Sequence, residues 1–199
     1  MIVRRSLFTV LFLLMSVTSG YAAEKAELGP NGLHVQDWFY PSKFDLLVDL
    51  QTANTQSKGL IILWEQLGCV YCAELHAVNF TRDDVVSMIV DNFLVVQLDM
   101  NGTREVVDFD GQKMTESQLA TKWQVGFTPT TMVLDGSDDQ VATLEAAEVF
   151  RLPGYLNPFY YHAALEFYSS GSYESQGFKT FVAARVAVIA KNGLTPDTW

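Results

Sequence analysis

The chain has few basic residues for its length. Of its 199 residues, 13 are Lys or Arg and 23 are Asp or Glu, so its formal net charge is -10. Phosphate backbones and anionic lipid surfaces attract cationic proteins and repel a protein this acidic. The composition therefore argues against nucleic acid and acidic membrane surfaces as partners.

Charged residues are also sparse, at 18% of the chain, whereas 49% of the residues are hydrophobic and 13% are aromatic. Disordered chains have the opposite composition, because they cannot bury enough apolar surface to offset the entropy of folding. A length of 199 residues suits one domain. We expect one globular domain with its own core.

Long apolar runs are absent except near the start. Residues 7–17 are almost wholly apolar, Arg4 and Arg5 precede them, and the small residues before Ala23 suit a signal peptidase. The run is shorter than the roughly 20 residues of a membrane-spanning helix. Residues 1–22 are therefore predicted to be a signal peptide cleaved near Ala22, rather than an anchor. General secretion fits better than twin-arginine export, and both routes lead out of the cytosol.

Cysteine is nearly absent, since Cys69 and Cys72 are the only two. Outside the cytosol such a pair can be a structural disulfide, part of a metal site or a redox centre. A disulfide across two intervening residues closes a very short loop and constrains the unfolded chain little. A closed zinc site would need two of His34, His76 and His162 to converge on the pair. A redox dithiol is the favoured interpretation.

The flanking residues support a redox role. Residues 59–64 are an apolar run typical of a strand buried on both faces. Three side chains recur at helical spacing in residues 70–80: Tyr71, Leu75 and Val78. Cys69 is thus predicted at a strand-to-helix corner, where the helix dipole lowers the pKa of a thiol. Cys69 is the expected attacking thiol, and Cys72 the resolving thiol that releases the partner.

The other segments alternate between helix and strand patterns, as in an α/β protein. Helices are predicted over 42–55, 81–89, 115–126, from 157 and over 178–189, and strands over 93–100, 131–134 and 148–152. Thr81 and the capping-box pair Thr115 and Gln118 mark two helix starts. Residues 104–115 are predicted to be an inserted hairpin with a two-residue turn at Asp110-Gly111.

Pro129 stands at the head of a predicted strand, in Phe127-Thr128-Pro129-Thr130. A proline there can simply begin an edge strand. Because a Cys-x-x-Cys follows one strand and this proline precedes another, we instead predict a cis Thr128–Pro129 bond.

These residues resemble the thioredoxin superfamily. The match spans about residues 58–191 and rests on a strand, Cys69-Val70-Tyr71-Cys72, a helix and then Thr128-Pro129. Within the superfamily, several segments are similar to the SoxW group of periplasmic thioredoxins from sulfur-oxidising bacteria: residues 65–76, 104–111, 152–155, 158–159 and 176–178.

The resemblance implies an α/β thioredoxin fold, a central mixed β-sheet flanked by helices, with the hairpin insertion and extra C-terminal helices. Residues 23–41 are then an N-terminal lead segment, 42–192 the thioredoxin-like domain and 193–199 a C-terminal tail. The implied protein is a monomeric periplasmic thiol-disulfide oxidoreductase, which a membrane thiol-electron carrier keeps reduced and which serves proteins of thiosulfate oxidation. Dithiol exchange itself needs no organic cofactor.

The resemblance also assigns residues. Cys69 and Cys72 are the redox pair, and Pro129 shapes the substrate groove. Thr128 and Tyr71 flank these residues in the sequence, and Tyr71 either contacts partner proteins or packs over the motif.

The chain departs from thioredoxin in two places. Val70 and Tyr71 replace the residues between the cysteines, so the reduction potential cannot be inherited. Leu63 stands where thioredoxin buries an aspartate, six residues before the first cysteine. Glu65 is the candidate replacement, because burial favours proton uptake by a carboxylate, here from Cys72. The alternative is a surface glutamate with no role.

Other aromatic and histidine side chains are ambiguous. His76 follows Cys72 by four residues and so shares its helix face, where it could hold charge or a metal. A partly exposed helix residue is the favoured interpretation. The aromatic residues in 159–161 and 167–168 recur at helical spacing, which is more typical of core packing than of a docking surface.

Two other classes of function stay open. The dithiol could act as a disulfide oxidant or isomerase for exported proteins, with which Thr128 before Pro129 is compatible, although the chain lacks room for a separate dimerisation domain. Alternatively, Cys69, Cys72 and His76 could form a copper or zinc carrier site, since soft ligands suit Cu(I).

Overall fold

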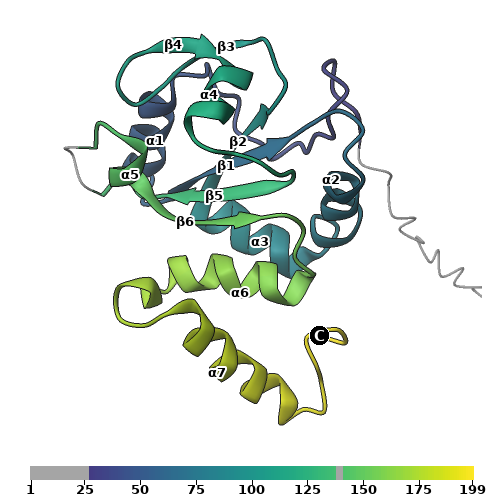
Figure 1. Ribbon diagram of the computed structural model, residues 1–199. Helices are drawn as coiled ribbons and strands as arrows, with labels where there is room; N and C mark the ends of the chain where they lie inside the picture. The colour runs from purple at the N-terminus through teal and green to yellow at the C-terminus, as the bar shows by residue number, and fades with distance from the viewer. Residues whose placement is uncertain (1–26, 138–140) are drawn as a thin grey trace, which may run out of the picture.

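The computed structural model describes residues 27–137 and 141–199. The predicted signal peptide, residues 1–22, lies outside the described residues. The main sheet has the order β2-β1-β5-β6 and comprises β1 (Gly59–Glu65), β2 (Phe93–Asp99), β5 (Thr130–Leu134) and β6 (Glu148–Pro153). β1 pairs parallel with β2 and antiparallel with β5, and β5 pairs antiparallel with β6. The mixed sheet of the predicted fold class is confirmed (Figure 1).

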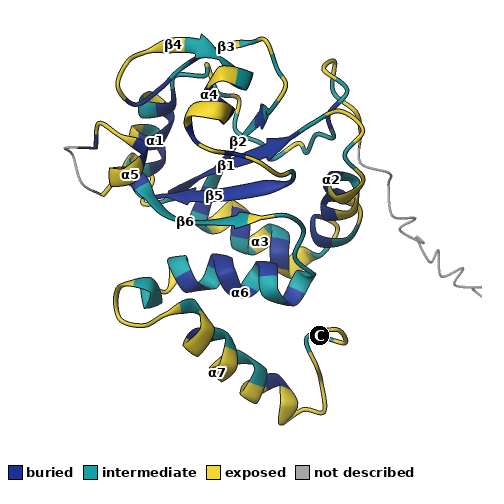
Figure 2. Ribbon diagram, viewed as in Figure 1, coloured by how far each residue is buried: buried dark blue, intermediate teal, exposed yellow. Residues whose placement is uncertain are grey.

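Helices cover both faces of this sheet. One face packs against α1 (Leu46–Thr55), α4 (Glu116–Lys122) and the short α5 (Leu144–Ala147). The other packs against the turn η1 (Leu75–Asn79), α3 (Asp83–Asn92) and α6 (Pro158–Ser169). β1 is therefore buried along its whole length (Figure 2), which explains its unbroken apolar run.

Additional elements extend the C-terminal side. After α6 comes a single 3₁₀ turn, η2 (Ser172–Glu174), and then α7 (Phe178–Ala190), which packs on α6. Phe159, Tyr161 and Phe167 are buried, so the core packing expected of these aromatic residues is confirmed. No helix in residues 27–137 and 141–199 is both long enough and apolar enough to cross a membrane.

The first helix begins later than predicted. Phe44 has a left-handed backbone with φ of 64°, which stops the helix from extending back to Ser42. Asp45 is the N-cap instead, and its side chain accepts a hydrogen bond from the Val48 N–H. Leu46 is buried in this helix, whereas Val48 is 51% exposed.

The helix after the cysteines changes its winding. It runs as α2 (Val70–Glu74) and continues as the single π-helical turn η1. Leu75 is buried, whereas Tyr71 is 63% exposed. Thr81 does not cap α3, because its hydroxyl donates back to the Ala77 and Val78 carbonyls and the N-cap position falls on Arg82.

The predicted hairpin consists of β3 (Glu105–Val107) and β4 (Lys113–Thr115). Its loop is longer than the predicted two-residue turn. The Asp108 N–H donates to the Gln112 carbonyl, and Gly111 takes the left-handed conformation with φ of 77°. A three-residue loop of this kind needs its glycine last. The capping box at Thr115 is confirmed, and α4 ends at Lys122 rather than at Gly126 because Gln124 has a positive φ.

The lead segment, described from residue 27 onward, lies along the edge strand β2. The Tyr40 N–H donates to the Val95 carbonyl at 2.8 Å, and Gln97 Nε2 donates to the His34 carbonyl at 2.6 Å. Leu33 is buried. At the other end of the chain, the Trp199 ring lies 4.4 Å from the Arg82 guanidinium. Both segments thus pack on the domain. The predicted domain limits, residues 42–192, stay a prediction.

Candidate active site

Cys69 and Cys72 are joined by a disulfide, with their Cα atoms 5.2 Å apart. Gly68 precedes them with φ of 73°, a left-handed conformation that turns the chain from β1 toward α2. Cys69 is the N-cap of α2, and its Sγ accepts a hydrogen bond from the Cys72 N–H at 3.0 Å. The predicted strand-to-helix corner is confirmed.

The two sulfurs differ in access to solvent. Cys69 is partly exposed, whereas Cys72 is only 1% exposed. A partner's sulfur can therefore reach Cys69, while Cys72 reacts from inside the protein. A backbone N–H directed at Cys69 Sγ also favours its thiolate, the nucleophilic form.

A second loop faces the disulfide. The Thr128–Pro129 peptide bond is cis, and Thr128 Oγ1 donates to Cys69 Sγ at 3.4 Å. The Gly154 N–H donates to the Pro129 carbonyl at 2.7 Å, which ties this loop to the end of β6. The structure thus brings Thr128 and Pro129 to Cys69 across 59 residues of sequence.

Exposed apolar side chains are concentrated around Cys69. Val70 is 78% exposed, Leu67 71%, Phe127 70% and Tyr71 63%. The Tyr71 ring stacks on Tyr155, with centroids 6.4 Å apart. These five side chains, which we call the apolar rim, give this edge of the molecule an apolar character despite the acidic composition.

Glu65 and His76 form a buried pair beside the redox motif. They are 1% and 0% exposed, and His76 Nε2 lies 3.1 Å from Glu65 Oε1. Glu65 Oε2 accepts a hydrogen bond from Gln97 Nε2, and Gln36 Nε2 lies 3.0 Å from His76 Nδ1. Glu65 is therefore not a surface residue.

The favoured interpretation of His76 as a partly exposed helix residue is wrong. The rings of Phe39 and Phe80 pack against it at 5.9 and 5.0 Å, and the lead segment closes over it. Sequence analysis could not find this, because His76 is covered by residues from distant parts of the chain.

Gln36 and Gln97 were missed by sequence analysis. Only Gln97 carried a weak signal, since it is a polar residue within an apolar strand pattern. Metal ligands do not converge in the described residues: no group of three or more His, Cys, Asp or Glu side chains is placed to hold an ion.

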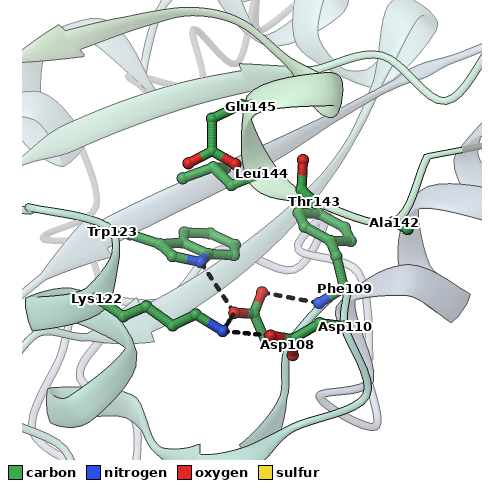
Figure 3. A pocket seen from close by; sticks show the side chains of 9 residues that line it. All are labelled: Asp108, Phe109, Asp110, Lys122, Trp123, Ala142, Thr143, Leu144 and Glu145. Atoms are coloured by element: carbon green, nitrogen blue, oxygen red, sulfur yellow. Dashed lines mark hydrogen bonds and ion pairs between the residues drawn. The ribbon is translucent and has the colours of Figure 1, made fainter.

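A small cavity of about 130 Å³ lies away from the disulfide, between the β3–β4 hairpin, α4 and α5 (Figure 3). Its buried carboxylate, Asp108, lies 2.7 Å from Lys122 Nζ and accepts a 3.4 Å hydrogen bond from Trp123 Nε1. Hydrogen bonds to Asp108 and Asp110 raise the pKa of Lys122. These contacts hold the hairpin on α4, and the cavity contains none of the predicted site residues.

Comparison with known proteins identifies the family of the chain. Residues 46–169 match the model of the thioredoxin-like domain family. A thioredoxin-fold protein from Helicobacter pylori is 20% identical, with a TM-score of 0.53 over 73% of this chain and 97% of that one. A thioredoxin from Thermus thermophilus is 18% identical, with a TM-score of 0.48 over 63% and 85%. No curated protein matches the chain. The chain belongs to the thioredoxin-like domain family, and with its Cys69-x-x-Cys72 pair it is a thiol-disulfide oxidoreductase.

Proposed function

We propose that this protein reduces disulfides or modified cysteines of exported partner proteins. The observation that carries the proposal is the pairing of an accessible Cys69 with a buried Cys72 at a strand-to-helix corner. In the reduced protein, the Cys69 thiolate attacks a partner's disulfide, forms a mixed disulfide and expels the partner's first thiolate. The Cys72 sulfur then attacks Cys69 Sγ and expels the second. The partner gains two electrons, and the protein returns to the disulfide form.

Glu65 accepts the Cys72 proton in this scheme. It points to the same face of the sheet as Leu63, which packs with Leu75 at the start of η1. Its carboxylate contacts His76 in η1, four residues beyond Cys72, and is only 1% exposed. The proton then passes to the expelled partner thiolate, so the exchange is neutral overall.

Partner proteins bind at the apolar rim in this proposal. Tyr71, Thr128 and Pro129 contact the segment that flanks the partner's cysteine. Exposed apolar side chains beside a reactive sulfur support this, because large exposed apolar patches mark interaction sites.

We further propose that the protein acts in the periplasm as a monomer, that a membrane thiol-electron carrier reduces it, and that its partners belong to a sulfur (thiosulfate) oxidation system. The sequence of residues 1–22 supports export, and the segments similar to the SoxW group support the partner class.

The reduction potential of the Cys69–Cys72 pair tests the direction of exchange. It is measured on the mature protein by equilibration with glutathione or dithiothreitol. A value near the roughly -270 mV of thioredoxin supports a reductant. A value near the roughly -120 mV of a strong oxidant means instead that the protein donates disulfides.

A trapping experiment tests the roles of the two sulfurs. Cys72→Ser should form a stable mixed disulfide at Cys69 and release one equivalent of thiol from an aromatic disulfide. Cys69→Ser should react far more slowly, because Cys72 is buried. Equal reactivity of the two variants contradicts the assignment.

A further inference from the structure

The lead segment contributes a side chain to the buried pair beside the redox motif. Gln36 Nε2 lies 3.0 Å from His76 Nδ1. His76 follows Cys72 by four residues. His76 lies in η1, the turn that directly continues the helix of Cys72, and its ring has Gln36 on one nitrogen and Glu65 on the other.

This arrangement fixes where the imidazole carries its proton. A side-chain amide nitrogen only donates hydrogen bonds, so His76 Nδ1 accepts one. The ring proton then stays on Nε2, which donates to Glu65 Oε1 at 3.1 Å. With a second donor at Gln97 Nε2, both oxygens of Glu65 receive hydrogen bonds.

We propose that Gln36 and His76 are positioning residues for thiol-disulfide exchange: Gln36 holds the His76 proton on Nε2, and this N–H keeps Glu65 ready to accept the Cys72 proton. This inference rests on the proposed function and deepens its proton-transfer step. It makes residues 27–41 a working part of the redox site rather than only a cover for β2.

Other titratable groups also face the pair. The His34 ring lies 5.2 Å from His76, and Asp99 pairs with Glu65 across β1 and β2. Tyr161 approaches from α6, and burial, together with the charge of Glu65, raises its pKa so that it stays neutral. None of these groups changes in the variants below, so they form a constant background.

Two substitutions at Gln36 should have opposite effects. Gln36→Leu removes the hydrogen bond that orients the ring through Nδ1, so the His76 N–H is held less firmly against Glu65 Oε1. Gln36→Glu places an acceptor against Nδ1, which favours a doubly protonated, cationic His76. A cation beside Glu65 makes its carboxylate a weaker base. Gln51→Leu, at an exposed glutamine of α1, is the matched control.

The probe is 5,5′-dithiobis(2-nitrobenzoate) added to the reduced, mature protein. The first thiol release reports attack by Cys69, and the second reports attack by Cys72 on the mixed disulfide. In Gln36→Leu, the acid limb of the pH-rate profile of the second phase should move up by about one pH unit, roughly a tenfold loss of rate on that limb. In Gln36→Glu the acid limb should move to lower pH, and the rate of the second phase on the plateau should be lower than in the wild type. The first phase should change little.

Nitrogen NMR of the His76 ring gives an independent result that a purely structural role would not produce. It should show the Nε2–H tautomer in the wild type and in the control, and a cationic ring in Gln36→Glu. The inference would be overturned if the acid limb moved in the same direction in Gln36→Leu and Gln36→Glu, or if it did not move in either variant although both fold. If Gln36→Leu does not fold, Gln36→Glu and the NMR spectra decide the question. A wild-type protein without a second phase would instead overturn the proposed function.

Discussion

Breaking the buried Glu65–His76 pair should destabilise the fold strongly. In His76→Leu, Glu65 keeps one donor, from Gln97, but loses the other inside a site with 1% exposure. In Glu65→Leu, the His76 Nε2–H group loses its acceptor at 3.1 Å. Each variant leaves a buried polar group short of a partner, whereas the double variant removes both groups.

The magnitude follows from the burial of both groups. A hydrogen bond to a charged group contributes about 1.5–3 kcal/mol, and removing one partner of a buried pair costs about 3–5 kcal/mol. We expect about 3 kcal/mol for each single variant, a large part of the 5–15 kcal/mol typical of a domain. The double variant should cost less than the sum by about 2 kcal/mol, because two apolar side chains replace the whole pair.

Urea unfolding of the oxidised protein, followed by tryptophan fluorescence, measures these free energies. A loss of about 3 kcal/mol should lower the unfolding midpoint by roughly 1–2 M. The reasoning is refuted if the single variants each cost less than about 1 kcal/mol, or if their effects add within about 0.5 kcal/mol.

Three other predictions concern backbone strain and buried charge. Burial raises the pKa of Asp49 from 3.8 to about 6, so the folded state binds more protons than the unfolded state between these values, and stability falls as pH rises through this window. Asp49→Asn should therefore stabilise the protein by about 1–2 kcal/mol at pH 7 and by nearly nothing at pH 3 in urea unfolding. Gly68→Ala should cost about 1–2 kcal/mol through its positive φ alone, since nothing lies within 4 Å of an added Cβ; an unchanged urea midpoint would contradict this. Lys122→Met should cost about 1–3 kcal/mol in thermal unfolding by leaving the buried Asp108 without its cation. Asp110→Asn, at an exposed carboxylate, should cost clearly less, and equal losses would contradict the role of Asp108.

The fold class could be predicted because its signals are local. The unbroken apolar run of β1, the alternation of helices and strands, and the capping box at Thr115 all depend on neighbouring residues. The errors arose where distant contacts or unusual backbone conformations act. Phe44 and Gln124 take positive φ values that no sequence signal announced, and they displaced the ends of two helices.

In the candidate site, too, the features set by neighbouring residues could be predicted, and those set by distant contacts could not. Cys69 and Cys72 could be identified from their spacing and from the strand before them, because the corner is built within a few residues. The burial of His76 could not, because the ring is covered by Phe39 and contacted by Gln36 from the lead segment. Glu65 was identified as a candidate, but its partners come from two other elements.

The sequence by itself determined the α/β class, the position of the dithiol at a helix start and the nature of its chemistry, because spacing and apolar pattern act over short distances. Only the tertiary structure decided which sulfur is accessible and which residues of the loop before β5 lie against Cys69. It also decided that a histidine and a glutamate share a buried hydrogen-bond network with two glutamines. These features depend on the packing of segments that are far apart in the sequence, and burial alone makes their polar contacts strong.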